Sequence, residues 1–143
     1  METPPRANKL PCLDSLPEAI PAELNEASGA VIAAAVEVHR HLGPGLLESV
    51  YEVALVHELT LRGMSVHRQV PVGVKYKDIE IGGQRIDLVV EPGVIVELKT
   101  VEVLLPVHEA QLLSYLKTTG LRVGLLINFN VKMLKDGIRR LVN

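Results

Sequence analysis

The sequence contains little of several residue types, and each shortage excludes a class of protein. Its 143 residues include a single cysteine, Cys12, so an internal disulfide is impossible and a reducing compartment such as the cytoplasm is expected. Aromatic residues make up only 3%, and 15 Lys and Arg against 17 Asp and Glu leave a net charge of -2. The basic excess that is typical of nucleic-acid-binding domains is therefore missing.

Long apolar runs are missing as well. No stretch is long enough to cross a membrane, and the N-terminus lacks the basic region and apolar run of an export signal. The sequence has no phosphate-binding glycine loop and no nucleophile elbow, and its histidines show no zinc-ligand spacing. These absences predict a protein that has no membrane association and does not bind zinc.

What the sequence does have is enough apolar material for one well-buried domain. Hydrophobic residues make up 48% of a chain whose length suits a single core. Five of the nine prolines fall at or before Pro21, in a segment without sustained periodicity. We therefore expect a flexible N-terminal tail over residues 1–24 and a single domain over residues 25–143.

The order of predicted elements indicates a mixed α/β fold. Two helices over residues 25–42 and 46–62 are followed by a strand over residues 64–76, and a helix over residues 105–119 precedes a continuous apolar strand at 123–127. A turn at residues 77–78 and the pair Gly82 and Gly83 are expected to lead into a second strand, and Pro92 and Gly93 separate it from a third. A run such as 123–127 suits a central strand that is reached by a crossover, so the sheet is expected to be mixed.

The most informative pattern lies on the second and third of these strands. Asp87 is followed ten positions later by Glu97, Leu98 and Lys99, within two apolar runs that read as buried strands. Because strand side chains alternate, Glu97 and Lys99 should share one face with Ile95. Charged groups in such a strand are costly unless they are paired or bind a metal, so this face is a candidate site. The alternative is an ordinary exposed ion pair.

Two helices contribute further candidates. On the second helix, Glu48 begins a row that continues through Glu52 and then turns apolar, so Glu48 should face the protein. On the helix over residues 105–119, Gln111 and Tyr115 lie four residues apart and border the apolar stripe. A polar row beside a core often lines a cleft, although a surface Gln and a half-buried Tyr would give the same pattern.

Together these residues resemble the PD-(D/E)xK nuclease superfamily, in particular its RecB-like branch. The order is Glu48 on an early helix, Asp87 on one strand, Glu97 and Lys99 on the next, and Gln111 and Tyr115 on the following helix. The segment from Gly45 to Tyr51 also fits the pattern that names the bacterial GxxExxY protein family, and this similarity covers about residues 26–143. The resemblance implies a restriction-endonuclease-like core, with helices flanking a central mixed sheet of four to five strands.

The resemblance also implies a function and a set of roles. It implies a nuclease that uses Mg²⁺ or Mn²⁺ to hydrolyse phosphodiester bonds in DNA or RNA. Metal ligands would be Asp87, Glu97, the Leu98 carbonyl and, through water, Glu48. Lys99 would orient the attacking water or stabilise charge on the phosphate, while Gln111 and Tyr115 would position the substrate.

Two other function classes stay open at this stage. One is a nuclease fold without cleavage activity that binds nucleic acid or a protein, and the other is a subunit that needs a partner chain. The low positive charge favours both, because affinity for a polyanion requires several Lys or Arg contacts. The most basic segment, at residues 130–143, is either a solvated final element or a phosphate contact, and a homodimer could join two such segments. Its cations are Lys132, Lys135, Arg139 and Arg140.

Overall fold

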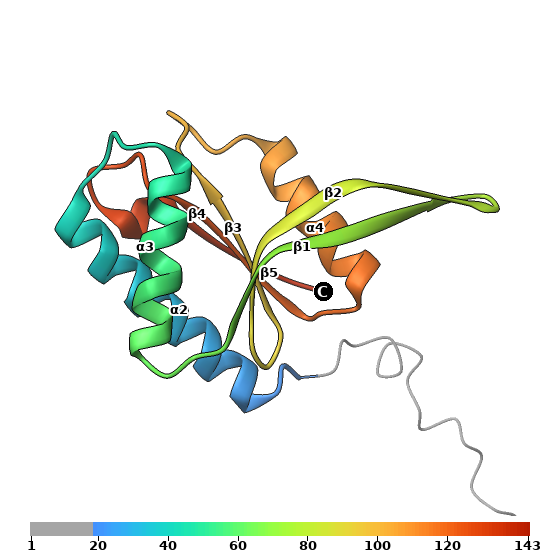
Figure 1. The fold of residues 1–143 in the computed structure, drawn as a ribbon, viewed down its shortest axis with the longest axis horizontal. Helices are drawn as coiled ribbons and strands as arrows, with labels where there is room; N and C mark the ends of the chain where they lie inside the picture. The colour runs from blue at the N-terminus through green and yellow to red at the C-terminus, as the bar shows by residue number, and fades with distance from the viewer. Residues whose placement is uncertain (1–18) are drawn as a thin grey trace, which may run out of the picture.

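The computed structural model describes residues 19–143, so most of the predicted tail lies outside the described residues and its boundary stays a prediction. Two helices, three strands, a helix and a strand follow one another as the sequence predicts (Figure 1). A short 3-10 helix and a last strand form the segment whose structure the sequence left open. The bounds are α2 (Ala22–Leu42), α3 (Glu48–Leu61), β1 (Val66–Tyr76), β2 (Ile79–Val90), β3 (Val94–Lys99), α4 (Pro106–Thr119), β4 (Val123–Asn128), η2 (Leu134–Gly137) and β5 (Ile138–Val142).

The five strands form one mixed sheet in the order β1-β2-β3-β4-β5. Only β3 and β4 pair in parallel, and α4 is the crossover that connects them. The other neighbours pair antiparallel. This arrangement confirms the predicted mixed sheet of four to five strands and the predicted crossover into a central strand, because β4 is fully buried between β3 and β5.

The sheet separates two apolar cores. Helices α2 and α3 cover one face and α4 covers the other (Figure 1). Val94, Val96 and Leu98 of β3 pack into the α2/α3-side core, whereas Ile95 packs into the α4-side core. The predicted assignment of faces in β3 is therefore confirmed, and by alternation Glu97 and Lys99 lie on the side of α4. Within residues 19–143, no helix combines the length and the apolar composition that a membrane crossing requires.

The hairpin of β1 and β2 is longer than the sequence predicts. Gly82 and Gly83 were expected to precede the second strand, and this expectation is wrong, because the ladder runs without a break in strand structure from Val66↔Val90 to Tyr76↔Ile79. Between the pairs Val72↔Gln84 and Val74↔Ile81, β2 contains one residue more than β1. Gly83 takes φ +109° there, a conformation that glycine adopts readily. The two glycines thus form a bulge inside the strand rather than a turn before it.

The final segment closes the sheet at its second edge. β5 pairs antiparallel with β4. Arg140 donates to the Asn25 side chain at 2.6 Å, and Arg139 lies 3.8 Å from Glu109, so these two cations have partners on helices. Lys132 and Lys135 are exposed around η2, and contact between this segment and phosphate stays a prediction.

Candidate active site

Strands β2 and β3 separate at Asp87 and Glu97. Their ladder holds only three residue pairs and ends at Leu88↔Val96. Beyond it, side chains take over the backbone hydrogen bonds: the Asp87 N–H donates to Glu97 Oε1 at 2.9 Å, and the Leu98 N–H donates to Asp87 Oδ2 at 2.9 Å. Each carboxylate is thereby held by the opposite strand, so the two acidic groups are fixed close together where the strands part.

Burial and mutual repulsion make it unfavourable for both carboxyl groups to be ionised at once. Glu97 is 3% exposed, and burial, reinforced by the charge of Asp87, raises its pKa to about 8. Burial also raises the pKa of Asp87, opposed by the hydrogen bond from Leu98. Two like charges in a shielded site disfavour simultaneous ionisation, so at neutral pH the pair retains a proton in the metal-free protein.

Lys99 and two residues of α4 lie beside this pair. Lys99 Nζ is 3.4 Å from Gln111 Oε1 and lowers the pKa of both carboxyl groups through its charge. Tyr115 is buried, and its pKa is raised by burial and then by the charge of Glu97. The structure thus brings Asp87, Glu97, Lys99, Gln111 and Tyr115 into one neighbourhood between β3 and α4.

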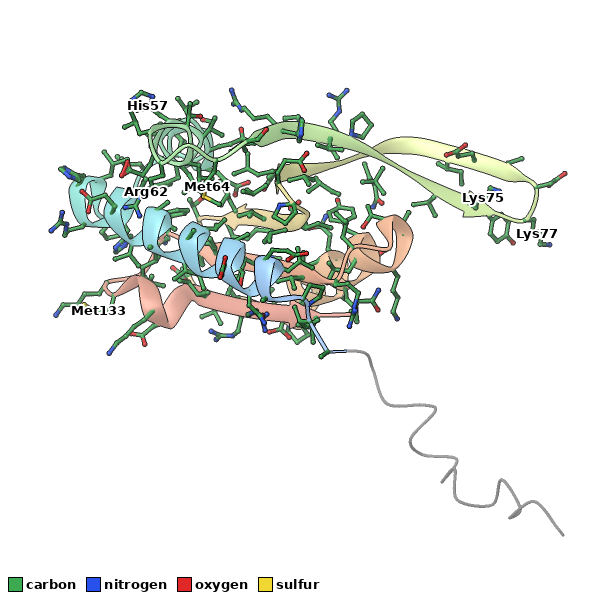
Figure 2. All side chains as sticks on the ribbon, turned by 90° about the horizontal axis from the view of Figure 1, so that it is seen from below. His57, Arg62, Met64, Lys75, Lys77 and Met133 are labelled. Atoms are coloured by element: carbon green, nitrogen blue, oxygen red, sulfur yellow. The ribbon has the colours of Figure 1, made fainter. Side chains whose placement is uncertain are left out.

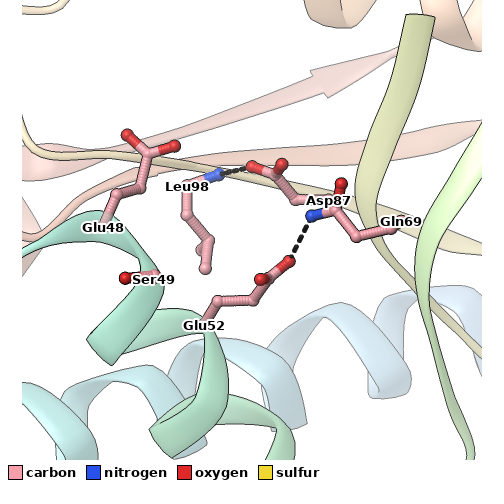
Figure 3. A pocket seen from close by; sticks show the side chains of 6 residues that line it. All are labelled: Glu48, Ser49, Glu52, Gln69, Asp87 and Leu98. Carbon is pink, nitrogen blue, oxygen red and sulfur yellow. Dashed lines mark hydrogen bonds between the residues drawn. The ribbon is translucent and has the colours of Figure 1, made fainter.

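Glu48 lies near Asp87 on the face of the sheet that α3 covers, opposite to the face that α4 covers. A cavity of about 310 Å³ is lined by Glu48, Ser49, Glu52, Gln69, Asp87 and Leu98 (Figure 3). Glu48 opens α3, and the backbone of Thr100, just after β3, acts to lower the pKa of its carboxyl group. Partial burial and the nearby Asp87 raise its pKa. Glu48 therefore borders the same cavity as Asp87, and the charge of Asp87 raises its pKa.

The model of the PD-(D/E)XK nuclease superfamily matches residues 25–141, which is most of the chain. The chain belongs to this superfamily. No curated protein and no solved structure gives a significant match.

In this PD-(D/E)XK chain, the cavity also contains residues to which the sequence assigned no role. Gln69 Nε2 donates to Glu52 Oε1 at 2.7 Å in the cavity wall (Figure 3). Arg68 of β1, outside the lining, lies 3.1 Å from the same Glu52 carboxylate. Gln69 and Asp87 both lie between the pairs Arg68↔Leu88 and Val70↔Ile86, and Gln69 takes φ +50°, which is uncommon for a residue other than glycine. In the sequence, the only sign of this cluster is that Glu52 lies one helical turn after Glu48. The partners of Glu52, Arg68 and Gln69, could be identified only from the fold.

The segment that gives Glu48 its position is held by Tyr51. The Tyr51 hydroxyl donates to the Gly43 carbonyl and accepts from the Leu46 N–H at 3.2 Å, while its ring stacks on Phe129 at 4.5 Å between centroids. Tyr51 is fully buried. Glu48 lies one turn before Tyr51 on α3, so the hydroxyl fixes the loop that leads directly into the cavity wall.

The loop after Lys99 is held by a buried asparagine. Asn128 ends β4 and is 1% exposed. Its Oδ1 accepts from the Val101 N–H at 3.1 Å and its Nδ2 donates to the Val101 carbonyl at 2.8 Å. A polar residue at the end of an apolar strand was the available signal, although the sequence does not name Val101 as its partner. This pairing fixes the path of the chain immediately beyond Lys99.

The donor set suits a hard divalent cation. Within residues 19–143, no three His, Cys, Asp or Glu side chains come close enough together to hold a metal ion by themselves. Asp87 and Glu97 nevertheless supply two adjacent carboxylates that repel each other until a cation or a proton intervenes, and oxygen is the donor that Mg²⁺ and Mn²⁺ prefer. The remaining ligands would have to come from water, from the Leu98 carbonyl or from Glu48 through water.

Proposed function

We propose that this chain is a metal-dependent nuclease that hydrolyses phosphodiester bonds of nucleic acid. The observation that carries the proposal is the hydrogen-bonded pair of Asp87 and Glu97 beside Lys99, at the point where β2 and β3 separate. Burying two adjacent carboxyl groups disfavours their ionisation and costs free energy in the metal-free fold, so a structural role alone gives no reason for the pair. Membership of the PD-(D/E)XK nuclease superfamily supports the same function.

Asp87 and Glu97 would hold Mg²⁺ or Mn²⁺, together with the Leu98 carbonyl and, through water, Glu48. A cation bound there would offset the charge that develops on the phosphate and lower the pKa of a coordinated water. In this proposal Glu97 holds a proton in the metal-free protein, and it would have to give up that proton to serve as a metal ligand.

Lys99 would act on the substrate rather than as a metal ligand. Its ammonium group lies close enough to influence both carboxylates and is held near Gln111 Oε1. From there it can donate to an attacking water or to a phosphate oxygen, which stabilises negative charge in the transition state. Gln111 and Tyr115 would limit the orientations of Lys99 and of the substrate.

We infer membership of the GxxExxY family within the RecB-like branch, in a bacterial protein of the cytoplasm. In support, the Glu and Tyr of the pattern have separate tasks here, because Glu48 lines the cavity and Tyr51 fixes the preceding loop. The combination of Gln111 and Tyr115 on α4 next to Lys99 fits the same branch.

The decisive experiment is cleavage by purified protein with Mn²⁺ at low salt, assayed on single-stranded and duplex DNA and RNA. Lys99→Ala should lower turnover by at least ~100-fold while Mn²⁺ affinity, measured by calorimetry, changes little. The matched control is Lys117→Ala, which removes an exposed lysine from the last turn of the same helix that carries Gln111. Cleavage that persists unchanged in Lys99→Ala would contradict the assignment.

A second candidate function is a nuclease-fold module that binds nucleic acid or a protein without cleaving. The observation in its favour is that no three acidic or histidine side chains in the described residues form a complete metal cluster, in a chain of net charge -2. Confirmed binding of Mn²⁺ or nucleic acid without cleavage of any of the four substrates would select this function.

A further inference from the structure

The tip of the β1 and β2 hairpin extends beyond the body of the domain. We define the arm as residues 73–83, which lie past the pair Val72↔Gln84. Figure 1 shows it projecting away from the helices, and the perpendicular view in Figure 2 shows Lys75 and Lys77 near its end, far from the other elements. An isolated two-stranded ribbon is marginally stable in water, so such an arm usually packs against another surface.

One face of the arm is apolar and exposed. Val74 pairs with Ile81 and Tyr76 pairs with Ile79, so these four side chains lie on one side of the ribbon. Their exposed fractions are 38%, 49%, 59% and 54% in that order. Since β1 alternates regularly, this face continues that of Val72, which packs into the α4-side core. The apolar face therefore extends a buried surface out into solvent.

The charges of the arm do not suit a nucleic acid. Lys75 lies opposite Glu80 in the ladder, and Lys77 is followed by Asp78 at the turn, so the two cations are balanced by two anions. Binding a polyanion requires uncompensated cations. Three of the four exposed apolar residues are aliphatic and offer no stacking surface to bases. The face is thus suited to an apolar protein surface.

The base of the arm offers a place for the tip of another arm. A groove of about 610 Å³ lies between the arm and the end of α4, lined by Pro71, Val72, Gly73, Val74, Lys75, Glu80, Thr118 and Thr119. Its walls are partly apolar, and it contains one cation and one anion. The tip of the arm likewise contains one cation, Lys77, and one anion, Asp78. The tip and the groove are therefore complementary in charge as well as in apolar character.

We propose that the arm is a dimerisation element: the apolar face of one arm covers that of a second copy of this chain, with each tip in the groove of the other copy. By alternation Lys75 and Glu80 lie on the other face of the ribbon, so in this two-fold arrangement the charges stay at the rim of the contact, where Lys77 and Asp78 of each tip lie beside the partner's groove. The arm offers residues 73–83 to the contact, whereas a standard interface involves about 20–30 residues a side, so the dimer is expected to be weak and dependent on concentration. This inference does not depend on the proposed nuclease activity.

The test is the molar mass by sedimentation equilibrium over a concentration series from about 5 µM to about 500 µM, a range that brackets a weak interface. The wild type should shift from monomer to twice the monomer mass. Replacing both Ile79→Glu and Ile81→Glu should weaken the association by at least ~100-fold, because four charges would enter an apolar contact. Circular dichroism checks that the variant is folded.

The matched control is the pair Val53→Glu and Leu61→Glu, which places the same charges at exposed aliphatic positions on α3. This variant should dimerise like the wild type. A wild type that stays monomeric throughout the series would overturn the proposal, and so would a dimer that survives the arm substitutions or is lost in the control.

Crosslinking tests the same interface if the variant with Ile79→Glu and Ile81→Glu does not fold. Tyr76→Cys in a Cys12→Ser background should be crosslinked to dimer size by a short bismaleimide, whereas Val53→Cys in that background should not. Equal crosslinking at the two positions would contradict an interface formed by the arms. Since neither readout involves cleavage, an inactive protein would leave this result unaffected.

Discussion

Proteins usually bury apolar side chains and expose charged ones. The two ends of the β1 and β2 hairpin break this rule in different ways. At the end that joins β3, Asp87 and the neighbouring Glu97 place carboxyl groups inside the fold. At the arm, Tyr76 and Ile79 expose apolar surface to water. Buried charge and exposed apolar surface both cost free energy in an isolated chain, so each end indicates a missing partner.

The difference between the ends lies in the kind of partner that each requires. The site end is rigid, because backbone N–H groups of opposite strands hold both carboxylates. What this end lacks is a cation to neutralise the two carboxylates. The arm has balanced charges, and what it lacks is a surface that covers its exposed apolar side chains. One hairpin thus presents a site for a cation at its base and a surface for a protein at its tip.

The largest effect is expected from removing a carboxylate at the site end. Asp87→Asn should reduce cleavage by at least ~100-fold and abolish the calorimetric signal of Mn²⁺ binding, because the amide removes the charge that attracts the cation. Glu91→Gln, which neutralises an exposed acid in the turn after β2, should leave both readouts near those of the wild type. Equal Mn²⁺ binding by wild type and Asp87→Asn would remove Asp87 from the metal site.

A smaller effect concerns the stability of the metal-free protein as a function of pH. The pKa of Glu97 is raised in the fold from its ordinary value of 4.5 to about 8, so the folded state binds the proton more tightly than the unfolded state. The resulting stabilisation is complete below the unfolded pKa and is lost as pH rises through about 8.

The melting temperature of the wild type in a chelator should therefore fall by about 5 °C or more between about pH 5 and pH 8.5. Glu97→Gln should show a smaller fall and should melt at or above the wild type at the higher pH, because repulsion with Asp87 is removed. The measurement is differential scanning calorimetry. A melting temperature of Glu97→Gln that lies several degrees below the wild type at both pH values would instead indicate that Glu97 is a structural partner of Lys99.

Next in size is the support of the cavity by Tyr51. Tyr51→Phe keeps the ring on Phe129 and removes the hydroxyl that binds Gly43 and Leu46, so unfolding in urea should show a loss of about 1 kcal/mol. If the loop positions Glu48, the variant should also lose activity at unchanged substrate affinity. A loss of stability with full activity would limit Tyr51 to a structural role.

The smallest effect is expected at the arm. Replacing Val74, Tyr76, Ile79 and Ile81 together by Thr retains strand propensity and removes apolar surface that the isolated chain does not bury. At a concentration where the protein is monomeric, the melting temperature should change by no more than about 3 °C. A much larger decrease would show that the arm contributes to the core of its own chain and would remove the contrast between the two ends.

The sequence by itself determined the order of the elements from α2 to β4 and most of their ends, but not η2 and β5. Apolar periodicity and glycine positions are local signals, which is why α2, α3 and α4 begin and end within about three residues of their predicted bounds. Alternation likewise determined that Glu97 and Lys99 share a face of β3 with Ile95. The order of the acidic residues pointed to the superfamily that the comparison then showed. The roles of Lys99, Gln111 and Tyr115 in chemistry stay predictions.

Only the tertiary structure decided which groups meet. The separation of β2 from β3 depends on hydrogen bonds between residues 10 and 11 positions apart, and the cluster of Glu52 with Arg68 and Gln69 joins a helix to a strand 16 and 17 residues later. The arm escaped prediction for the same reason, because glycines that read locally as a turn become a bulge once a long partner strand is present. Local patterns specify elements, whereas partners are selected by packing between distant segments, and that selection determines where charge is buried and where apolar surface is left exposed.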